Sequence, residues 1–452
     1  MKKTKKTVFR CDGCGHEEPR WLGRCPQCGE WNTLKESAVT MPVSVSLAGP
    51  GAKGNSLPLN AIRVSEGERM PTGIGEFDRV LGGGIMKKSC VLVGGEPGIG
   101  KSTLLLQAAA SCATKGRILY VSGEESAEQI RLRADRLGLV GERIELFCSG
   151  DLVAIQRIVE AVKPVLIIVD SVQTLHSAEI GPVPGTVNQM KYGAHELISW
   201  VKERDSALIL VAHVTKDGVI AGPKTLEHMV DTVLYFEQNE SEHRFLRAAK
   251  NRFGSVDELG IFIMGEQGLV PQEDSAALFL VHREGDLPAG VATAAVLEGS
   301  RVLLLEIQAL TVPAKGATSR VSSERIEASR VARIAATLEK HLNLRLSDQD
   351  IYINVSGGVR VSEVGVDLAI AAAIHSARSG VALSSRCAFA GELSLAGEVR
   401  PVRKLALRMK TAETLGFDRF VGPSAGKGEP IVRGAGSKAV ANLAAAVASM
   451  LS

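Results

Sequence analysis

The stretch Cys90-Val-Leu-Val-Gly-Gly-Glu-Pro-Gly-Ile-Gly-Lys-Ser-Thr103 decides the fold of this chain. It contains the pattern Gly-x-x-x-x-Gly-Lys-Ser, in which backbone N–H groups of a glycine-rich loop surround a phosphate at the start of a helix. The apolar run Cys90–Val93 predicts a buried strand before the loop, and Thr103–Ala113 predicts a helix after it. This order indicates an α/β domain that binds a nucleotide.

The loop predicts roles for its own residues. Lys101 is expected to reach the β- and γ-phosphates, and the Ser102 hydroxyl is expected to coordinate Mg²⁺. The complete set of expected nucleotide-binding residues is Gly95, Glu96, Pro97, Gly98, Ile99, Gly100, Lys101, Ser102 and Thr103.

Further apolar runs predict more strands of a parallel sheet covered on both faces: Ile118–Val121, Val165–Val169 and Ala207–Val211. Polar residues that follow such strands lie at the edge where these sheets bind ligands. Asp170 is therefore predicted as the second magnesium ligand. Glu124 is predicted as the base that activates water, with Glu125 as the alternative, although both also suit the start of the next helix. His213 either senses the γ-phosphate or is an ordinary residue at a strand end.

Composition places the chain among ordinary globular proteins of several domains, since 45% of its 452 residues are hydrophobic and 23% are charged. The expected divisions are a cysteine-rich segment at 1–36, a linker at 37–58, the nucleotide-binding domain at 59–272 and an α+β domain at 273–452. A net charge of +3 neither supports nor excludes nucleic acid, and 4% aromatic residues argue against a wall of stacking rings. Because no long apolar run is present, we expect no membrane span and a cytoplasmic protein.

Four cysteines form two Cys-x-x-Cys pairs, Cys11/Cys14 and Cys25/Cys28, each followed by glycine. Two such pairs supply the four thiolates of a structural zinc site. The alternatives are unliganded thiols or a redox dithiol. Trp21 and Trp31 flank the second pair and are expected to pack on the metal-binding turns, with a recognition role as the alternative.

The pentapeptide Lys250-Asn-Arg-Phe-Gly254 places two cations in one predicted turn. Lys250 and Arg252 could complete the site of a neighbouring subunit, as an arginine finger does. Spacing alone leaves a solvated basic turn as the other interpretation.

These motifs, together with Pro71–Gly84 and Gly222–Asp231, resemble the RadA (Sms) family of bacterial DNA repair proteins along essentially the whole chain. The resemblance implies a RecA-type P-loop ATPase core that uses ATP and Mg²⁺, between an N-terminal zinc ribbon and a Lon-protease-like domain. It implies a homohexamer that encircles single-stranded DNA, acts on branched DNA and drives branch migration in homologous recombination. A RecA recombinase or a replicative helicase is the implied protein partner. Lys101, Ser102 and Asp170 carry over as nucleotide and magnesium residues, with Lys101 and Asp170 also catalytic. Glu124 carries over as the base, and Lys250 and Arg252 carry over as a catalytic pair that acts between subunits.

The last domain resembles Lon-type proteases without their catalytic pair. Gly365 falls at the position of the nucleophilic serine and Ala406 at that of the lysine, whereas Ser362 and Lys404 are out of register. We therefore expect no peptidase activity. Residues 315–345 carry seven Lys or Arg against three Glu, which indicates either a DNA path or a solvated helix face. The loop His176–Met190 is a further candidate for contact with DNA.

Two other functions remain as hypotheses beside the DNA motor. One is an ATP-switched recombination scaffold whose zinc module docks a recombinase or helicase. The other is an ATP-dependent peptidase, which would have to use Ser362 or Lys404.

Overall fold

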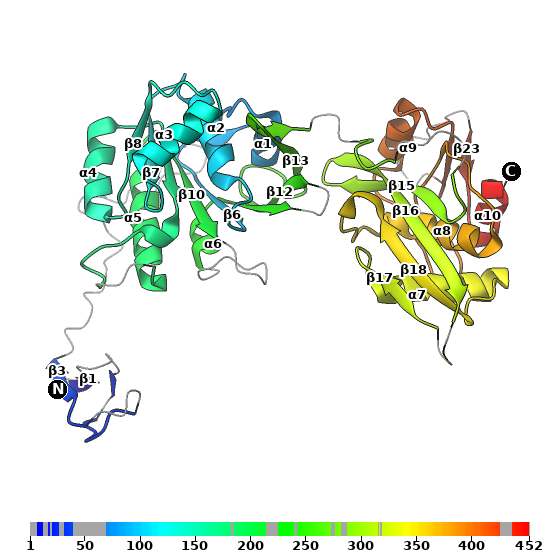
Figure 1. Cartoon of the computed structure of the whole chain (residues 1–452), viewed down its shortest axis with the longest axis horizontal. Helices are drawn as coiled ribbons and strands as arrows, with labels where there is room; N and C mark the ends of the chain where they lie inside the picture. The colour runs from blue at the N-terminus through cyan, green and yellow to red at the C-terminus, as the bar shows by residue number, and fades with distance from the viewer. Residues whose placement is uncertain are drawn as a thin grey trace, which may run out of the picture. The chain divides into compact units, whose positions relative to one another are not determined.

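Contacts divide the chain into two units, residues 1–65 and 66–452. The computed structural model in Figure 1 describes residues 7–11, 17–18, 20–26, 31–38, 69–181, 185–213, 225–238, 242–272, 276–281, 287–314, 316, 319–424 and 436–451. No helix in these ranges is long and apolar enough to cross a membrane.

The N-terminal unit contains a small antiparallel sheet in the order β2-β1-β3. Its strands are β1 (Thr7–Cys11), β2 (Glu17–Glu18) and β3 (Leu34–Ala38). Strand β3 ends inside the segment that the sequence predicts as a linker; the rest of that segment lies outside the described residues. The buried Cys25 packs against Phe9 and Leu22. A core this small explains why the sequence predicts a metal to stabilise the unit.

The nucleotide-binding domain is built on a nine-stranded sheet in the order β14-β13-β12-β11-β6-β10-β9-β7-β8. The strands from β11 to β8 run parallel, and β12 to β14 add antiparallel strands at one edge. Its strands are β6 (Cys90–Gly95), β7 (Ile118–Ser122), β8 (Ile144–Phe147), β9 (Leu166–Asp170), β10 (Ala207–His213), β11 (Thr232–Gln238), β12 (His243–Asn251), β13 (Leu259–Gly265) and β14 (Gly268–Pro271). The predicted parallel-rich sheet is confirmed.

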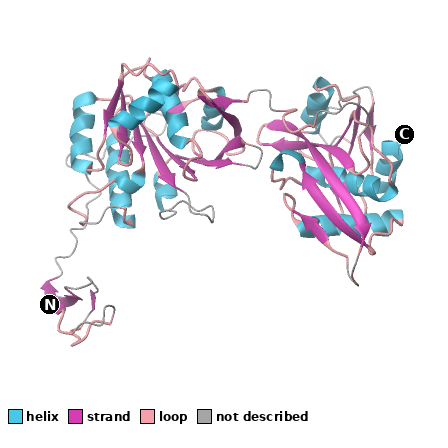
Figure 2. Ribbon diagram, in the orientation of Figure 1, coloured by secondary structure: helices cyan, strands magenta, loops and turns pink. Residues whose placement is uncertain are grey.

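Helices cover both faces of this sheet (Figure 2). The helices are α1 (Gly75–Leu81), α2 (Lys101–Cys112), α3 (Ala127–Arg136), α4 (Leu152–Val162), α5 (Val187–Lys202) and α6 (Thr225–Met229). Alternate side chains of β6 show how the faces divide: Val91 and Val93 pack in one apolar cluster with α2, whereas Leu92 packs in another with α4 and α5. A short pair, β4 (Arg69–Met70) and β5 (Ile85–Met86), flanks α1.

The C-terminal part has a seven-stranded mixed sheet in the order β17-β18-β16-β15-β19-β22-β23. Its elements are β15 (Val291–Glu298), β16 (Arg301–Pro313), β17 (Val321–Ser323), α7 (Ala328–Leu342), β18 (Gln349–Val355), α8 (Asp367–Ser379), β19 (Cys387–Phe389), β20 (Glu392–Leu393), β21 (Val399–Arg400), α9 (Leu405–Thr414), β22 (Arg419–Gly422), β23 (Ser437–Ala439) and α10 (Leu443–Leu451). Parallel and antiparallel pairs occur in one sheet with helices between them, as the α+β prediction requires.

A buried ion pair joins the nucleotide-binding sheet to the C-terminal sheet. Glu76, at the start of α1, is fully buried. Its carboxylate accepts hydrogen bonds from both terminal nitrogens of Arg301, the first residue of β16. The same carboxylate accepts a hydrogen bond from the Ile261 backbone N–H at 3.0 Å. The charge of Glu76 is thus satisfied from both parts of the 66–452 unit, which is the condition under which a buried carboxylate is tolerated.

Candidate nucleotide site and its surroundings

The phosphate loop connects the end of β6 to the start of α2. Gly98 and Gly100 have φ values of +79° and +111°, which favour glycine. A β-carbon on Gly98 would contact nothing within 4 Å, so the backbone there is open to a ligand. Lys101 begins α2 and folds back across the loop, where its Nζ donates to the carbonyls of Gly95 at 2.7 Å and Glu96 at 2.9 Å.

Burial lowers the pKa of Lys101, and the nearby carboxylates of Asp170, Glu124 and Glu96 oppose that shift. A phosphate bound in the loop would add negative charge beside this ammonium. The loop therefore fits the phosphates of a nucleotide both in backbone shape and in charge.

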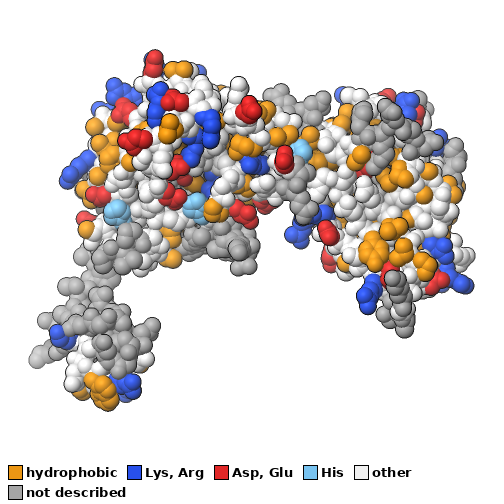
Figure 3. Space-filling model, viewed as in Figure 1, with side chains coloured by type: hydrophobic (Ala, Val, Ile, Leu, Met, Phe, Trp, Pro, Cys, Tyr) orange, Lys and Arg blue, Asp and Glu red, His pale blue; other side chains and the backbone are white. Residues whose placement is uncertain are grey.

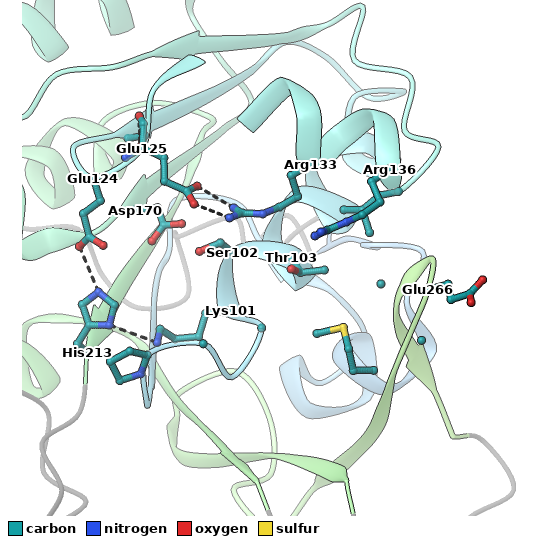
Figure 4. A pocket seen from close by; sticks show the side chains of 18 residues that line it. Lys101, Ser102, Thr103, Glu124, Glu125, Arg133, Arg136, Asp170, His213 and Glu266 are labelled. Atoms are coloured by element: carbon teal, nitrogen blue, oxygen red, sulfur yellow. Dashed lines mark hydrogen bonds and ion pairs between the residues drawn. The ribbon is translucent and has the colours of Figure 1, made fainter. Parts of the chain in front are cut away.

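The loop opens into a cavity of about 660 Å³, which lies in the size range of small-molecule sites. Its lining brings together the loop and residues from distant strands (Figure 4): Lys101, Ser102, Thr103, Glu124, Glu125, Arg133, Arg136, Asp170, His213, Met264 and Glu266 are among them. Every expected catalytic residue except Lys250 and Arg252 lines it.

The Ser102 hydroxyl and the Asp170 carboxylate supply oxygen donors to the same cavity, which suits Mg²⁺. Asp170 ends β9, and its Oδ2 accepts a hydrogen bond of 2.7 Å from the fully buried Tyr120 hydroxyl on β7. Sequence analysis missed Tyr120. The signal was present, since a buried hydroxyl inside the apolar run Ile118–Val121 requires a polar partner.

The two candidate bases have different partners. Glu125 forms a two-bond ion pair with Arg133 of α3, with 2.8 Å between Nη1 and Oε2. Glu124 instead accepts a hydrogen bond from the Ser171 hydroxyl, and its Oε1 lies 3.1 Å from Nε2 of His213. The neighbouring guanidinium neutralises the charge of Glu125, whereas the partners of Glu124 among these contacts are a hydroxyl and an imidazole.

His213, which the sequence left undecided, lies between the two chemically important groups of the pocket. Its Nδ1 is 3.5 Å from Nζ of Lys101, and its other nitrogen contacts Glu124. Figure 4 shows this chain of contacts. Arg133, Arg136 and Met264 also line the cavity without having been predicted, because α3 and the end of β13 reach it only through the folded sheet.

Lys250 and Arg252 lie at the other end of the sheet from the phosphate loop. Lys250 Nζ donates to the carbonyls of Glu227 at 2.8 Å and Val230 at 2.7 Å, which lie at the end of α6 and just after it. Arg252 pairs with Asp231 at 3.1 Å, and the other oxygen of Asp231 accepts from the Cys90 N–H, where β6 begins. The phosphate loop follows the opposite end of β6. Neither cation therefore serves the pocket of its own chain.

The zinc prediction falls largely outside the described residues, which exclude Cys14, Cys28 and the side chain of Cys11. Four thiolates in two Cys-x-x-Cys pairs remain a donor set that fits Zn²⁺. Trp21 and Trp31 are 54% and 69% exposed, and their packing on the metal-binding turns stays a prediction, because residues 12–16 and 27–30 lie outside the described ranges.

The predicted DNA-contacting segments are only partly free to bind. Of the basic residues in 315–345, Arg330 is buried and donates to Asp367 at 2.6 Å, so it stabilises the C-terminal core instead. Arg320, Arg333, Lys340 and Arg345 are exposed. The loop His176–Met190 is fixed at its base by Gln189, whose amide bonds the Ser177 backbone at 2.8 and 3.0 Å; residues 182–184 lie outside the described ranges.

At Gly365, the position expected for a protease nucleophile, the space that a side chain would need is occupied by neighbouring residues. A β-carbon on Gly365 would lie 2.5 Å from Oε1 of Glu363 and 3.0 Å from Nη1 of Arg408. Arg408, on α9 beside Ala406, has no exposed side-chain surface and holds both oxygens of Glu363 at 2.9 and 3.0 Å. A serine side chain at 365 would collide with this ion pair.

A phosphate loop at the end of a parallel strand, with acidic residues at the ends of the neighbouring strands and an antiparallel extension, defines a RecA-type P-loop ATPase core. Family descriptions match each part of the chain: an AAA domain at residues 68–219, a rubredoxin metal binding domain at 9–36, and subunit ChlI of Mg-chelatase at 320–426.

Whole-chain relatives are similar over nearly their entire length. DNA repair protein RadA of Treponema pallidum is 54% identical over 425 residues, which cover 94% of this chain and 93% of the relative. RadA of Brucella abortus is 44% identical, covering 95% and 94%, and RadA of Bacillus subtilis is 43% identical, covering 94% of each. A KaiC-like protein of Pyrococcus horikoshii matches with a TM-score of 0.39 and 22% identity, over 46% of this chain and 99% of that one. The chain belongs to the family of the DNA repair protein RadA.

Proposed function

We propose that this chain hydrolyses ATP in response to single-stranded DNA and, as a homohexameric ring, drives branch migration of recombination intermediates. The observation that carries the proposal is the separation of Lys250 and Arg252 from the pocket of their own chain. A surface that offers cations at one end of the sheet and a nucleotide site at the other suits head-to-tail contacts, which form a ring when the rotation between subunits closes.

Within one pocket, Lys101 and the loop N–H groups would hold the β- and γ-phosphates, and Ser102 and Asp170 would hold Mg²⁺. Glu124 is the proposed base, because Glu125 is already committed to Arg133. Bound magnesium would neutralise phosphate charge that develops during hydrolysis. Arg252 and Lys250 of one subunit would face the γ-phosphate held by the next.

Mixed rings test the exchange of residues between subunits. Lys101→Ala removes a subunit's own phosphate contact and leaves its Arg252 intact, whereas Arg252→Ala does the reverse. Each variant alone is expected to lose about a thousandfold in ATP turnover. A mixture should recover activity, because a Lys101→Ala subunit can complete the intact pocket of an Arg252→Ala neighbour. If the mixture stays inactive although differently tagged subunits co-purify, the trans assignment is wrong.

A strand-extension assay on branched DNA separates the motor from the scaffold hypothesis. The motor should extend the branch only with hydrolysable ATP. DNA-stimulated hydrolysis without branch extension by the purified protein would favour the ATP-switched scaffold.

A further inference from the structure

Two exposed indole rings lie close together on the N-terminal unit. Trp21 is 54% and Trp31 69% exposed. A β-carbon on Gly23 would lie 3.7 Å from Cη2 of Trp21 and 3.9 Å from Cζ3 of Trp31, so both rings border the same point of the backbone. In Figure 3, hydrophobic atoms lie beside Lys or Arg atoms on the surface of this unit.

The backbone around the rings is ordered by local contacts. The Asn32 N–H donates to the Gly23 carbonyl at 2.8 Å, and Arg24 forms an antiparallel bridge with Trp31. The Arg24 guanidinium lies 5.8 Å from the centre of the Trp31 ring, within the range of a cation–π contact. These two contacts hold the backbone around Gly23 and Arg24 beside that around Trp31 and Asn32.

This exposure requires an explanation. Each indole could bury a large apolar area, yet the small core of this unit is formed by Cys25, Phe9 and Leu22. Among the described residues next to the rings in the chain, the exposed charged side chains are Arg20 and Arg24, whereas Glu30, beside Trp31, lies outside the described ranges. Aromatic rings accompanied by arginines are the combination that stacks unpaired bases while attracting the phosphate backbone.

We propose that Trp21 and Trp31, with Arg20 and Arg24, form a stacking platform for single-stranded DNA, separate from the ATPase domain. The inference rests on the proposed function for the presence of single-stranded DNA, and it adds a second contact with that strand. Tryptophan and arginine also dominate protein interfaces. Arg20 and Arg24 are placed to contact phosphates while the rings stack bases, so we assign the surface to nucleic acid, and protein docking is the outcome that would replace this proposal.

Intrinsic fluorescence of the full-length protein tests the platform directly. The chain has three tryptophans, and the third, Trp200, bonds Glu160 in the ATPase domain. In a Trp200→Phe background all tryptophan emission comes from the two rings. Titration with labelled oligo(dT), followed by both anisotropy and emission, should give quenching that saturates together with binding. An abasic oligonucleotide of the same length should bind through its phosphates without quenching.

Substitutions supply the second measurement. Replacing both rings with alanine should weaken oligo(dT) binding at least about fivefold, because each stacked base contributes strongly. The matched double substitution to phenylalanine keeps aromatic faces and should retain most of the affinity. Unchanged zinc content and circular dichroism would show that the variants still fold.

The outcomes are distinct. DNA binding without quenching, or equal quenching by the abasic strand, overturns the platform proposal and points to a protein as the partner of the two rings. Neither result contradicts the proposed ring motor. Absence of any DNA binding overturns both proposals.

Discussion

Glu124 and His213 meet across the nucleotide pocket, with 3.1 Å between Oε1 and Nε2, and the other nitrogen of the same imidazole lies 3.5 Å from Nζ of Lys101. One ring therefore links the proposed base to the lysine proposed to hold the γ-phosphate. A phosphate that repositions Lys101 would act on Glu124 through this ring. Hydrolysis could in this way be tied to correct occupation of the loop.

The two adjacent glutamates should respond differently to the same substitution. Glu124→Gln is expected to lower kcat by about 10²- to 10⁴-fold with ATP binding retained, because it removes a general base without removing a phosphate contact. Glu125→Gln should weaken only the ion pair with Arg133 and leave kcat within about tenfold of the wild type. Steady-state hydrolysis and binding of a fluorescent ATP analogue check both. The reverse order would identify Glu125 as the base.

Tyr120 should make stability depend on alkaline pH. Burial, with a further contribution from the charge of Asp170, raises the pKa of Tyr120 well above its usual value. The folded state therefore holds the phenol proton more tightly than the unfolded chain does. This contribution is fully present below pH about 10 and is lost as the pH rises further.

Tyr120→Phe removes that dependence together with the hydrogen bond to Asp170. At pH 8 the loss should be about 1.5–3 kcal/mol, as for hydrogen bonds to charged groups. Denaturant unfolding of the wild type and of Tyr120→Phe should show that the difference in their free energies of unfolding becomes smaller above about pH 10. A difference that stays constant with pH would contradict the link between the pKa of Tyr120 and stability.

The buried Glu76–Arg301 pair should be costly to break from one side. Arg301→Met leaves the Glu76 carboxylate buried without its main partner, which is expected to cost about 3–5 kcal/mol of unfolding free energy. Combining it with Glu76→Leu should recover much of that loss. Arg117→Met provides the control, because Arg117 and Glu145 form an exposed pair that contributes about 0–1 kcal/mol. If the two arginine substitutions lowered the free energy of unfolding equally, the buried Glu76–Arg301 pair would have no special role in stability.

Serine at position 365 should disturb the domain without creating a peptidase. Gly365→Ser is expected to cost about 1–3 kcal/mol, because the new side chain overlaps the carboxylate of Glu363. Gly141→Ser is the control: a β-carbon there contacts nothing within 4 Å, and exposed substitutions usually change stability by less than about 0.5 kcal/mol. Casein cleavage by the Gly365→Ser protein would contradict the steric account.

Local motifs predicted the parts of the site that are continuous in sequence. The phosphate loop could be read directly, because the glycines, Lys101 and Ser102 act through spacing along one turn. Asp170 and Glu124 followed from a general property of parallel sheets, whose strands end at a common edge. These residues line one cavity, although their roles in hydrolysis stay predictions.

Contacts between distant segments could not be predicted. Arg133 and Met264 reach the pocket from α3 and β13, and only the order of strands in the folded sheet brings them there. Arg330 was predicted as part of a basic surface, but it is buried and donates a hydrogen bond to Asp367, a contact that the sequence alone does not indicate.

The Glu363–Arg408 pair has a consequence for how the C-terminal domain can evolve. No single substitution places a serine at 365 without disturbing this pair. Serine at 365 collides with Glu363, and loss of Glu363 leaves the fully buried guanidinium of Arg408 without its carboxylate. A serine at 365 therefore requires residues 363, 365 and 408 to change together, so this ion pair restricts which side chains the C-terminal domain accepts at that position.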